Sequence, residues 1–226
     1  MGLNRRNDRS VRVVFGLFIL TLVLFCCVFQ TSDSFAQGVY EVTARVRYVI
    51  DGDTIVLDNG EHVRYKGVNA PEIRHDDMEA EPFGYEALRR NRDLVQGKTV
   101  RLVIDRAEER DRHQRLIAQI FLPDGRCVQD VLVSEGLATV CAYDHLVRPD
   151  HGLLNLQVRA IGAKRGMWSV PPARPEHYYI GNRASMRFHR PSCPYGRQTS
   201  KLHTMIFYSR EEAFKAGYCP CRRCLP

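Results

Sequence analysis

The stretch VIDGDTIVLDNGEHVRYKGVNAPE, residues 49–72, carries most of the information about the fold. Its Asp-Gly-Asp segment at 51–53 is typical of a turn, and residues 54–58 have the β-branched composition of a strand. Asn59-Gly60 is a strong hairpin signal, and residues 62–66 predict the returning strand. The stretch therefore predicts a tight β-hairpin near the start of a mainly β domain.

The same stretch gathers groups that suit phosphate chemistry. Asp51, Asp53, Asn69 and Glu72 offer oxygen atoms of the kind that a hard cation prefers. Arg64 offers a guanidinium, which pairs bidentately with a phosphate. Because a cation, a carboxylate base and a guanidinium together suit phosphodiester hydrolysis, the sequence predicts a metal-dependent nuclease.

Strand and helix signals continue downstream of this stretch. Further strands are predicted at 39–48, 98–105 and 116–122, and helices at 83–96, 128–135 and 153–164. The expected fold is a mainly β, α+β domain: a five-stranded OB-type barrel with three helices, at residues 40–169. The proline-rich linker at 170–177 then leads to a second, small domain at 178–226.

Composition and charge support a globular chain with an anionic partner. The 226 residues are 44% hydrophobic and 26% charged, which argues against a disordered protein. The net charge is +7, and residues 178–226 alone hold nine Lys/Arg against two Glu. The basic excess therefore lies in the small domain and favours contact with nucleic acid there.

The N-terminus has the pattern of a targeting segment. Four arginines precede an apolar run at 13–29, and Ser34-Phe35-Ala36 fits a signal-peptidase site. We expect residues 1–36 to be a signal peptide, with an uncleaved membrane anchor as the alternative. Either reading places the folded part outside the cytoplasmic membrane, as a periplasmic or secreted protein.

The predicted barrel domain resembles the staphylococcal nuclease family over residues 40–169. The resemblance rests on motifs in the same order: IDGDT at 50–54, VRYKGVNAPE at 63–72, FGYEA at 83–87, RDRHQR at 110–115, PDGRCVQDVLVSEGLATV at 123–140 and AKRGMW at 163–168. It implies an OB-fold barrel and Ca²⁺-dependent cleavage of DNA and RNA.

The resemblance also implies a role for each motif residue. Asp53 would bind Ca²⁺ directly, and Asp51 would lie just outside the ligand sphere. Glu72 would activate the attacking water. Arg64 and Arg115 would hold the phosphate and stabilise the charge that develops on it, which is a large catalytic contribution in phosphoryl chemistry.

The chain departs from the family pattern at two places. Well-known members have Asp-Thr before the Pro-Glu pair, whereas this chain has Asn69-Ala70. Asn69 can still ligate through its amide oxygen and Ala70 through its backbone carbonyl, but the loss of one negative charge predicts weaker binding or a broader range of metals. His113-Gln114 replaces the expected Tyr-Gly pair. Tyr143 is either a nucleic-acid contact or a core residue.

The tail has the spacing of a zinc site. His189 and Cys193 are four residues apart, and Cys221 and Cys224 are three apart, which together give a closed set for structural Zn²⁺. Cys219 is a weaker fifth candidate. The alternative is two disulfides among the four tail cysteines. In the barrel domain, a Cys127–Cys141 disulfide and a pair of free thiols remain equal alternatives.

The tail resembles the metal-binding domain of the Ada DNA-repair protein, through FHRPSC at 188–193, SREEAFKAGY at 209–218 and PCRRC at 220–224. In that family the first ligand is a cysteine that accepts methyl groups. Here it is His189, so methyl-acceptor activity is not expected. Arg187, Arg190, Arg222 and Arg223 predict a tether to the nucleic-acid backbone. A purely structural appendage is the alternative.

Two functions follow from these patterns. The first is an exported Ca²⁺-dependent endonuclease acting on DNA and RNA, monomeric, and in contact with the membrane only if its leader is uncleaved. The second is a catalytically weak OB module that binds nucleic acid. Retention of Asp53, Arg64, Glu72 and Arg115 favours the enzyme.

Overall fold

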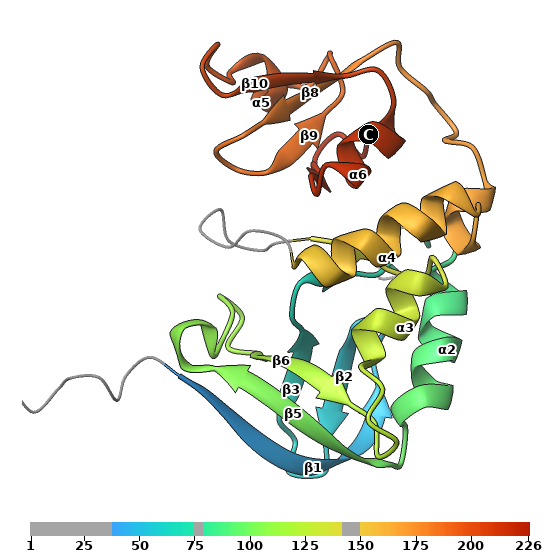
Figure 1. The fold of residues 1–226 in the computed structure, drawn as a ribbon, viewed down its shortest axis with the longest axis vertical. Helices are drawn as coiled ribbons and strands as arrows, with labels where there is room; N and C mark the ends of the chain where they lie inside the picture. The colour runs from blue at the N-terminus through green and yellow to red at the C-terminus, as the bar shows by residue number, and fades with distance from the viewer. Residues whose placement is uncertain (1–37, 75–78, 142–149) are drawn as a thin grey trace, which may run out of the picture. The chain divides into compact units, whose positions relative to one another are not determined.

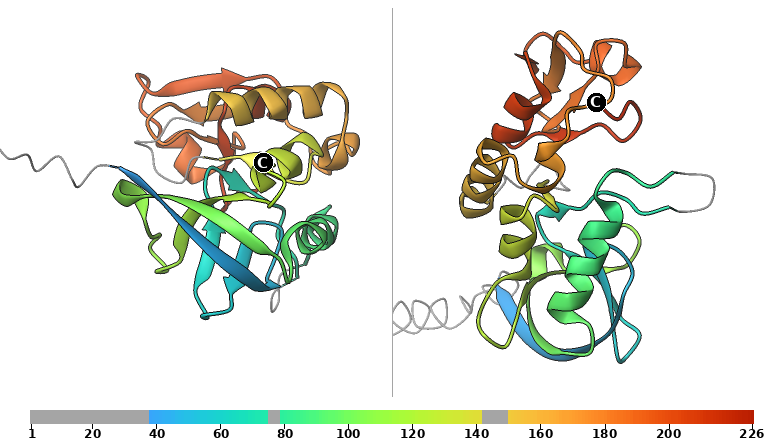
Figure 2. Two further views of the ribbon diagram at one scale, coloured as in Figure 1. Left: turned by 60° about the horizontal axis from the view of Figure 1, so that its bottom comes forward. Right: turned by 90° about the vertical axis from the view of Figure 1, so that its right-hand side faces the viewer.

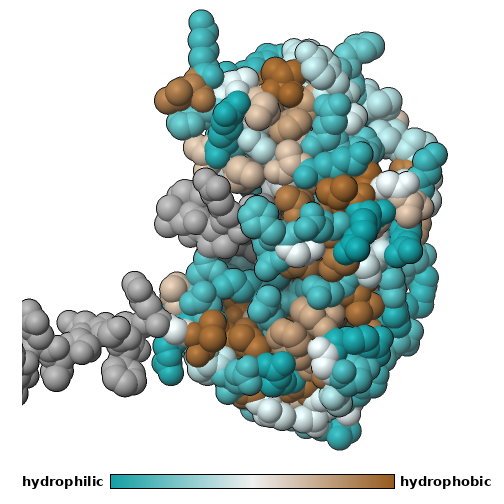
Figure 3. All heavy atoms as spheres, viewed as in Figure 1, coloured by the Kyte–Doolittle hydropathy of each residue, from teal (hydrophilic) through white to brown (hydrophobic). Residues whose placement is uncertain are grey.

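A computed structural model describes residues 38–74, 79–141 and 150–226 of the chain (Figure 1). The predicted leader at 1–36 and Tyr143 lie outside these residues. Within the described part, no helix is both long and apolar enough to span a membrane. On the face drawn in Figure 3, hydrophobic patches are interrupted by hydrophilic side chains.

Five strands close into a barrel, which confirms the predicted fold class. They are β1 (Val39–Val49), β2 (Thr54–Leu57), β3 (His62–Tyr65), β5 (Thr99–Asp105) and β6 (Leu116–Phe121). Their order around the barrel is β1-β2-β3-β6-β5, and only the β3–β6 pair is parallel. Alternate residues of β5 and β6 are buried, as the sequence pattern requires.

Two local features allow the barrel to close. The hairpin between β2 and β3 turns at Asn59-Gly60, where Gly60 has a φ of 84° that favours glycine. The long strand β1 pairs with β5 along its first part and with β2 along its last part, with a register shift between Val46 and Tyr48. Such an irregularity bends a strand and carries it from one partner to the next.

Three helices accompany the barrel, also as predicted. They are α2 (Gly84–Val95), α3 (Val128–Ser134) and α4 (His151–Gly162), with short 3₁₀ turns η1 (Arg106–Glu108) and η2 (Gly166–Ser169). Both views in Figure 2 show α2 lying along the barrel wall. Its face formed by Ala87, Leu88, Leu94 and Val95 is buried in the barrel core. The two-residue strands β4 (Val68–Asn69) and β7 (Thr139–Val140) pair separately.

The C-terminal region forms its own small sheet. Its strands β8 (Tyr179–Asn182), β9 (Arg187–His189), β10 (Thr204–Phe207) and β11 (Cys219–Pro220) lie in the order β10-β8-β9-β11. Two short helices complete it, α5 (Pro194–Arg197) and α6 (Arg210–Lys215). The N-terminus of α6 is capped, since Ser209 Oγ accepts from the Glu212 amide at 3.1 Å, and the Glu212 carboxylate accepts from the amide of the preceding Tyr208 at 2.7 Å.

A second hydrophobic core joins this region to the end of the barrel domain. Ala160 and Ile161 of α4 and Trp168 of η2 belong to the same cluster as the aromatic residues of the tail. The Trp168 ring meets the Phe214 ring edge-on, with centroids 5.0 Å apart. Buried Gln157 adds a polar link: its amide group donates to the Phe214 carbonyl at 2.6 Å, and its oxygen accepts from the Val140 amide at 2.7 Å.

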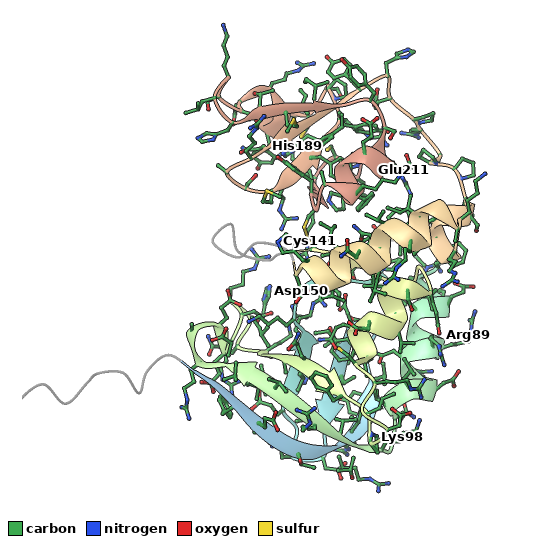
Figure 4. All side chains as sticks on the ribbon, in the orientation of Figure 1. Arg89, Lys98, Cys141, Asp150, His189 and Glu211 are labelled. Atoms are coloured by element: carbon green, nitrogen blue, oxygen red, sulfur yellow. A yellow bond between two sulfur atoms is a disulfide. The ribbon has the colours of Figure 1, made fainter. Side chains whose placement is uncertain are left out.

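A disulfide between Cys141 and Cys219 fastens the same two regions (Cys141 is labelled in Figure 4). Both alternatives for Cys141 were therefore wrong: it is neither free nor bonded to Cys127, which is a free thiol. The alternative of two disulfides within the tail is also wrong, because Cys193, Cys221 and Cys224 are free. Sequence spacing could not reveal this pair, which is separated by 78 positions.

Removal of this disulfide is expected to destabilise the protein. A loop of 78 residues restricts the unfolded chain strongly, so we expect the Cys141→Ser/Cys219→Ser double variant to lose about 2–4 kcal/mol of unfolding free energy. Denaturant unfolding of both proteins measures the difference. Cys127→Ser is the matched control, because Cys127 is a free thiol at the N-cap of α3, where serine is favourable. An unchanged midpoint in the double variant would contradict the expectation.

Candidate active site

One pocket of about 310 Å³ collects all three predicted catalytic residues, Arg64, Glu72 and Arg115. It is lined by Asp51, Asp53, Arg64, Glu72, His113, Arg115 and Arg222. All except Arg222 come from the barrel domain. The structure thus brings together the guanidinium groups of Arg64 and Arg115 and three carboxylates. The residues concerned span 64 positions of the sequence, from Asp51 to Arg115.

The centre of the site is a buried ion pair between Asp53 and Arg64. Asp53 directly precedes β2 and Arg64 lies in β3, where the hairpin pairs it with Thr54. The guanidinium Nη1 lies 2.7 Å from Asp53 Oδ1, and the Ala70 amide donates to Oδ2 at 2.5 Å. Burial raises the pKa of Asp53 to about 6, while Arg64 opposes this shift and Asp51 adds to it. Burial also lowers the pKa of Arg64.

The turn before β2 is held by α2. The Asp51 side chain accepts from the Asp53 amide at 2.9 Å, which fixes the turn. Asn91 of α2, fully buried, donates to the Asp51 carbonyl at 3.0 Å and accepts from the Tyr65 hydroxyl at 2.7 Å. The helix therefore sets the position of both aspartates.

Glu72 is half-buried in the pocket, and its backbone is fixed from two sides. Its amide donates to Glu81 Oε2 at 3.0 Å, and its carbonyl accepts from the Glu81 amide at 2.9 Å. Gly84 lies so close that a Cβ there would collide with the Glu72 carbonyl oxygen. Burial, chiefly, raises the pKa of Glu72, and the nearby Asp53 contributes. A carboxylate with a raised pKa is a better proton acceptor than an ordinary one.

Arg115 is oriented by Asp111, a residue that the sequence analysis missed. Its Nε and Nη2 lie 2.8 and 2.7 Å from Asp111 Oδ2, and its amide donates to Oδ1 at 3.0 Å. The His113 amide donates to the same oxygen at 2.8 Å, which closes the turn and presents His113 to the pocket. The sequence did contain a signal for this contact, since Asp111 lies four residues before Arg115.

Asn69 and Ala70 stand apart from the pocket lining. Asn69 Oδ1 accepts from Arg64 Nη2 at 3.2 Å, and the Ala70 carbonyl accepts from Asn69 Nδ2 at 3.0 Å. Both oxygens predicted as metal ligands are thus engaged by protein donors, and their ligand role stays a prediction. The carboxylates of Asp51, Asp53 and Glu72 do line the pocket, and carboxylate oxygens, which can accept a donor and bind a metal at the same time, fit a hard divalent cation.

The tail residues predicted to bind zinc do come together. The ligand atoms of His189, Cys193, Cys221 and Cys224 all lie within 4.8 Å of one another, and the first three residues are buried (His189 is labelled in Figure 4). Ligands of a tetrahedral zinc–thiolate site are about 3.8 Å apart, so the arrangement fits a structural Zn²⁺. Cys219, the fifth candidate, is bonded to Cys141 instead.

The predicted basic tether does not form a single surface. Arg190 contacts the Arg174, Cys224 and Leu225 carbonyls and the Glu176 carboxylate, and so holds the chain end. Arg187 donates to the Pro220 carbonyl at 3.2 Å. The Arg223 guanidinium lies over the Tyr195 ring, 5.2 Å from its centroid. Arg222 alone among these four lines the pocket.

The fold is an OB-type barrel, and its pocket combines carboxylates with guanidinium groups. This combination is typical of a phosphodiesterase. The chain belongs to the family of staphylococcal nuclease homologues, whose model matches residues 62–170. The model of the metal-binding domain of Ada matches residues 171–226. Both resemblances inferred from the sequence are confirmed.

Curated relatives carry nuclease names. Endonuclease YncB of Bacillus subtilis (strain 168) is 42% identical over 94 residues, which are 40% of this chain and 44% of that protein. An uncharacterized endonuclease of Escherichia coli O157:H7 is 37% identical over 139 residues, 58% of this chain and 83% of that protein. Thermonuclease of Staphylococcus hyicus is 31% identical over 132 residues, 57% and 77% of the two chains. The chain thus spans less than half the length of YncB.

Proposed function

We propose that the protein is an endonuclease that hydrolyses phosphodiester bonds of DNA, and also of RNA, with Ca²⁺ as its metal. The observation that carries the proposal is the shared pocket of Arg64, Glu72 and Arg115 beside Asp53. These residue types supply a base and two phosphate ligands at one place. The nuclease names of the family relatives support the same activity.

Each residue has a physical role in the proposed reaction. Arg64 and Arg115 bind the non-bridging oxygens of the phosphate, and Asp111 holds the Arg115 guanidinium through contacts to its Nε and Nη2. Glu72 accepts a proton from the water that attacks phosphorus. The guanidinium groups stabilise the negative charge that grows on the phosphate oxygens as the bond to the leaving oxygen breaks.

Asp53 would hold the calcium ion, with Asp51 beside it. When bound, calcium supplies positive charge next to the phosphate oxygens. Because Asn69 lacks the charge of an aspartate and its oxygen accepts from Arg64, we expect weak calcium binding or a tolerance for other divalent ions.

Export is part of the proposal, as the leader pattern suggests. The Cys141–Cys219 disulfide supports it, because disulfides persist in oxidising compartments. The zinc ion of the tail would be structural, since four ligands leave no open position for a substrate. The protein is proposed to act as a monomer.

Cleavage of circular single-stranded DNA tests the proposal, because a circle is opened only by attack within the strand. We expect purified protein to cut the circle with added Ca²⁺ and to stop when EGTA is added. Cutting with Mn²⁺ in place of Ca²⁺ would agree with the predicted tolerance for other divalent ions. Retained DNA binding without cleavage, under all metals, would contradict the enzyme and favour the binding module.

A further inference from the structure

Arg222 belongs to the zinc-binding tail, yet it lines the pocket that holds Glu72, Arg64 and Arg115. It lies between the zinc ligand candidates Cys221 and Cys224. The barrel residues of the pocket are supplied by segments between positions 51 and 115, so the tail adds a group from far along the chain.

Several restraints hold the Arg222 loop in place. The Cys221 amide donates to the Phe188 carbonyl at 2.9 Å, and the Leu225 amide donates to the Cys221 carbonyl at 3.0 Å, which closes the loop. Three residues before Arg222, Cys219 is bonded to Cys141.

The barrel end of this connection leads directly to the catalytic segment. The Cys141 amide donates to the Gly67 carbonyl at 2.8 Å, and the preceding strand β7 pairs with β4, which ends three residues before Glu72. The Arg222 loop and the Glu72 segment are therefore joined by a short route of one disulfide and one strand pair.

The guanidinium of Arg222 is available to a ligand. Its side chain is exposed, and among the described residues it has no hydrogen bond or ion pair. By contrast, Arg187 and Arg190 bond to backbone carbonyls, and Arg223 contacts Tyr195. Arg222 lowers the pKa of Glu72 against the larger effect of burial, which places its charge near that carboxylate.

We propose that Arg222 is a third phosphate ligand of the active site, and that the zinc-binding tail thereby completes the pocket for a nucleic-acid substrate. The inference rests on the proposed nuclease function. An extra guanidinium would bind a phosphate oxygen of the bound strand, and its position would depend on zinc at Cys221 and Cys224. The tail then acts as part of the active site and not only as a tether.

Arg222→Ala, Arg222→Lys and the control Arg183→Ala test the proposal. Arg183 lies in the same tail, is exposed, and is outside the pocket lining, so its loss removes the same charge elsewhere. The first measurement is binding of a fluorescein-labelled trideoxynucleotide in EGTA over a range of salt. The second is kcat and KM for single-stranded DNA with Ca²⁺. Zinc content and thermal midpoint show that each variant is folded.

We expect Arg222→Ala to bind the trinucleotide about tenfold more weakly and to reduce the salt slope by about one, as the loss of one phosphate contact does. We expect kcat/KM to fall by at least as much, Arg222→Lys to be intermediate, and Arg183→Ala to match the wild type. Unchanged binding and kcat/KM in Arg222→Ala would overturn the proposal. Faster cleavage would also overturn it, since Arg222 would then obstruct the pocket.

The binding measurement separates this inference from the proposed function. If the wild type fails to cleave DNA but Arg222→Ala still loses affinity and salt slope, the nuclease proposal fails while the phosphate contact stands. If the wild type cleaves DNA and Arg222→Ala equals it in both measurements, the nuclease proposal stands and the proposed phosphate contact of Arg222 is wrong.

Discussion

Glu72→Gln is expected to lower kcat by about 10²–10⁴-fold, the range for loss of a general base. Glutamine has the shape of glutamate but cannot take a proton from water. The backbone bonds of Glu72 to Glu81 do not involve the altered group, so the local structure should persist. Because burial raises the pKa of Glu72, its replacement by a neutral group should not lower the thermal midpoint. Single-turnover cleavage of labelled single-stranded DNA measures the effect.

Glu86→Gln is the matched control for this prediction. Glu86 lies on the exposed face of α2 and pairs with Arg89 at 3.0 Å, a contact worth a few tenths of a kcal/mol. It should leave kcat unchanged. Equal rates for wild type and Glu72→Gln would contradict the role of Glu72 as the general base.

Loss of a zinc ligand is expected to unfold the tail. The four-ligand cluster should bind one Zn²⁺, and a structural zinc contributes about 10–16 kcal/mol in small zinc domains. We therefore expect Cys193→Ser or Cys224→Ser to reduce zinc to well below one ion per chain. Trp168 is the single tryptophan and packs on Phe214 of the tail, so its emission should shift to longer wavelength. Metal analysis and fluorescence measure the two effects.

Cys127→Ser is the control here as well, because Cys127 is a free thiol outside the cluster. It should keep its zinc and its Trp168 emission. Full zinc content together with an unshifted spectrum in Cys193→Ser would show that the cluster is not a metal site.

Much of the barrel could be predicted because its signals are local. Asn59-Gly60 marks the hairpin, and the alternation in residues 99–105 and 116–121 marks strands whose inner faces are buried. That three of the pocket residues would lie together could be predicted for another reason: Asp53, Arg64 and Glu72 lie within twenty residues of one another in one motif. The cluster of candidate zinc ligands could be predicted because His189 and Cys193, and Cys221 and Cys224, form two closely spaced pairs in the sequence.

The remainder depends on contacts between distant positions. Nothing in the spacing of Cys141 and Cys219 indicates that they meet, and the sequence offered Cys127 as a nearer partner. The charge of Arg190 and of Arg222 is the same, yet one holds the chain end and the other lines the pocket. The difference lies in the contacts of each side chain in the folded tail, which their positions in the sequence do not reveal.

The bond between Cys141 and Cys219 also bears on how the protein would withstand proteolysis. The segment at 170–177 is mostly exposed and contains no helix or strand, so it is an open site for proteases. A cut there would divide the chain after the barrel domain, but the disulfide would keep both fragments covalently attached. On a denaturing gel, the nicked molecule would separate into two bands only after the disulfide is reduced. In its native state it would retain every residue of the pocket.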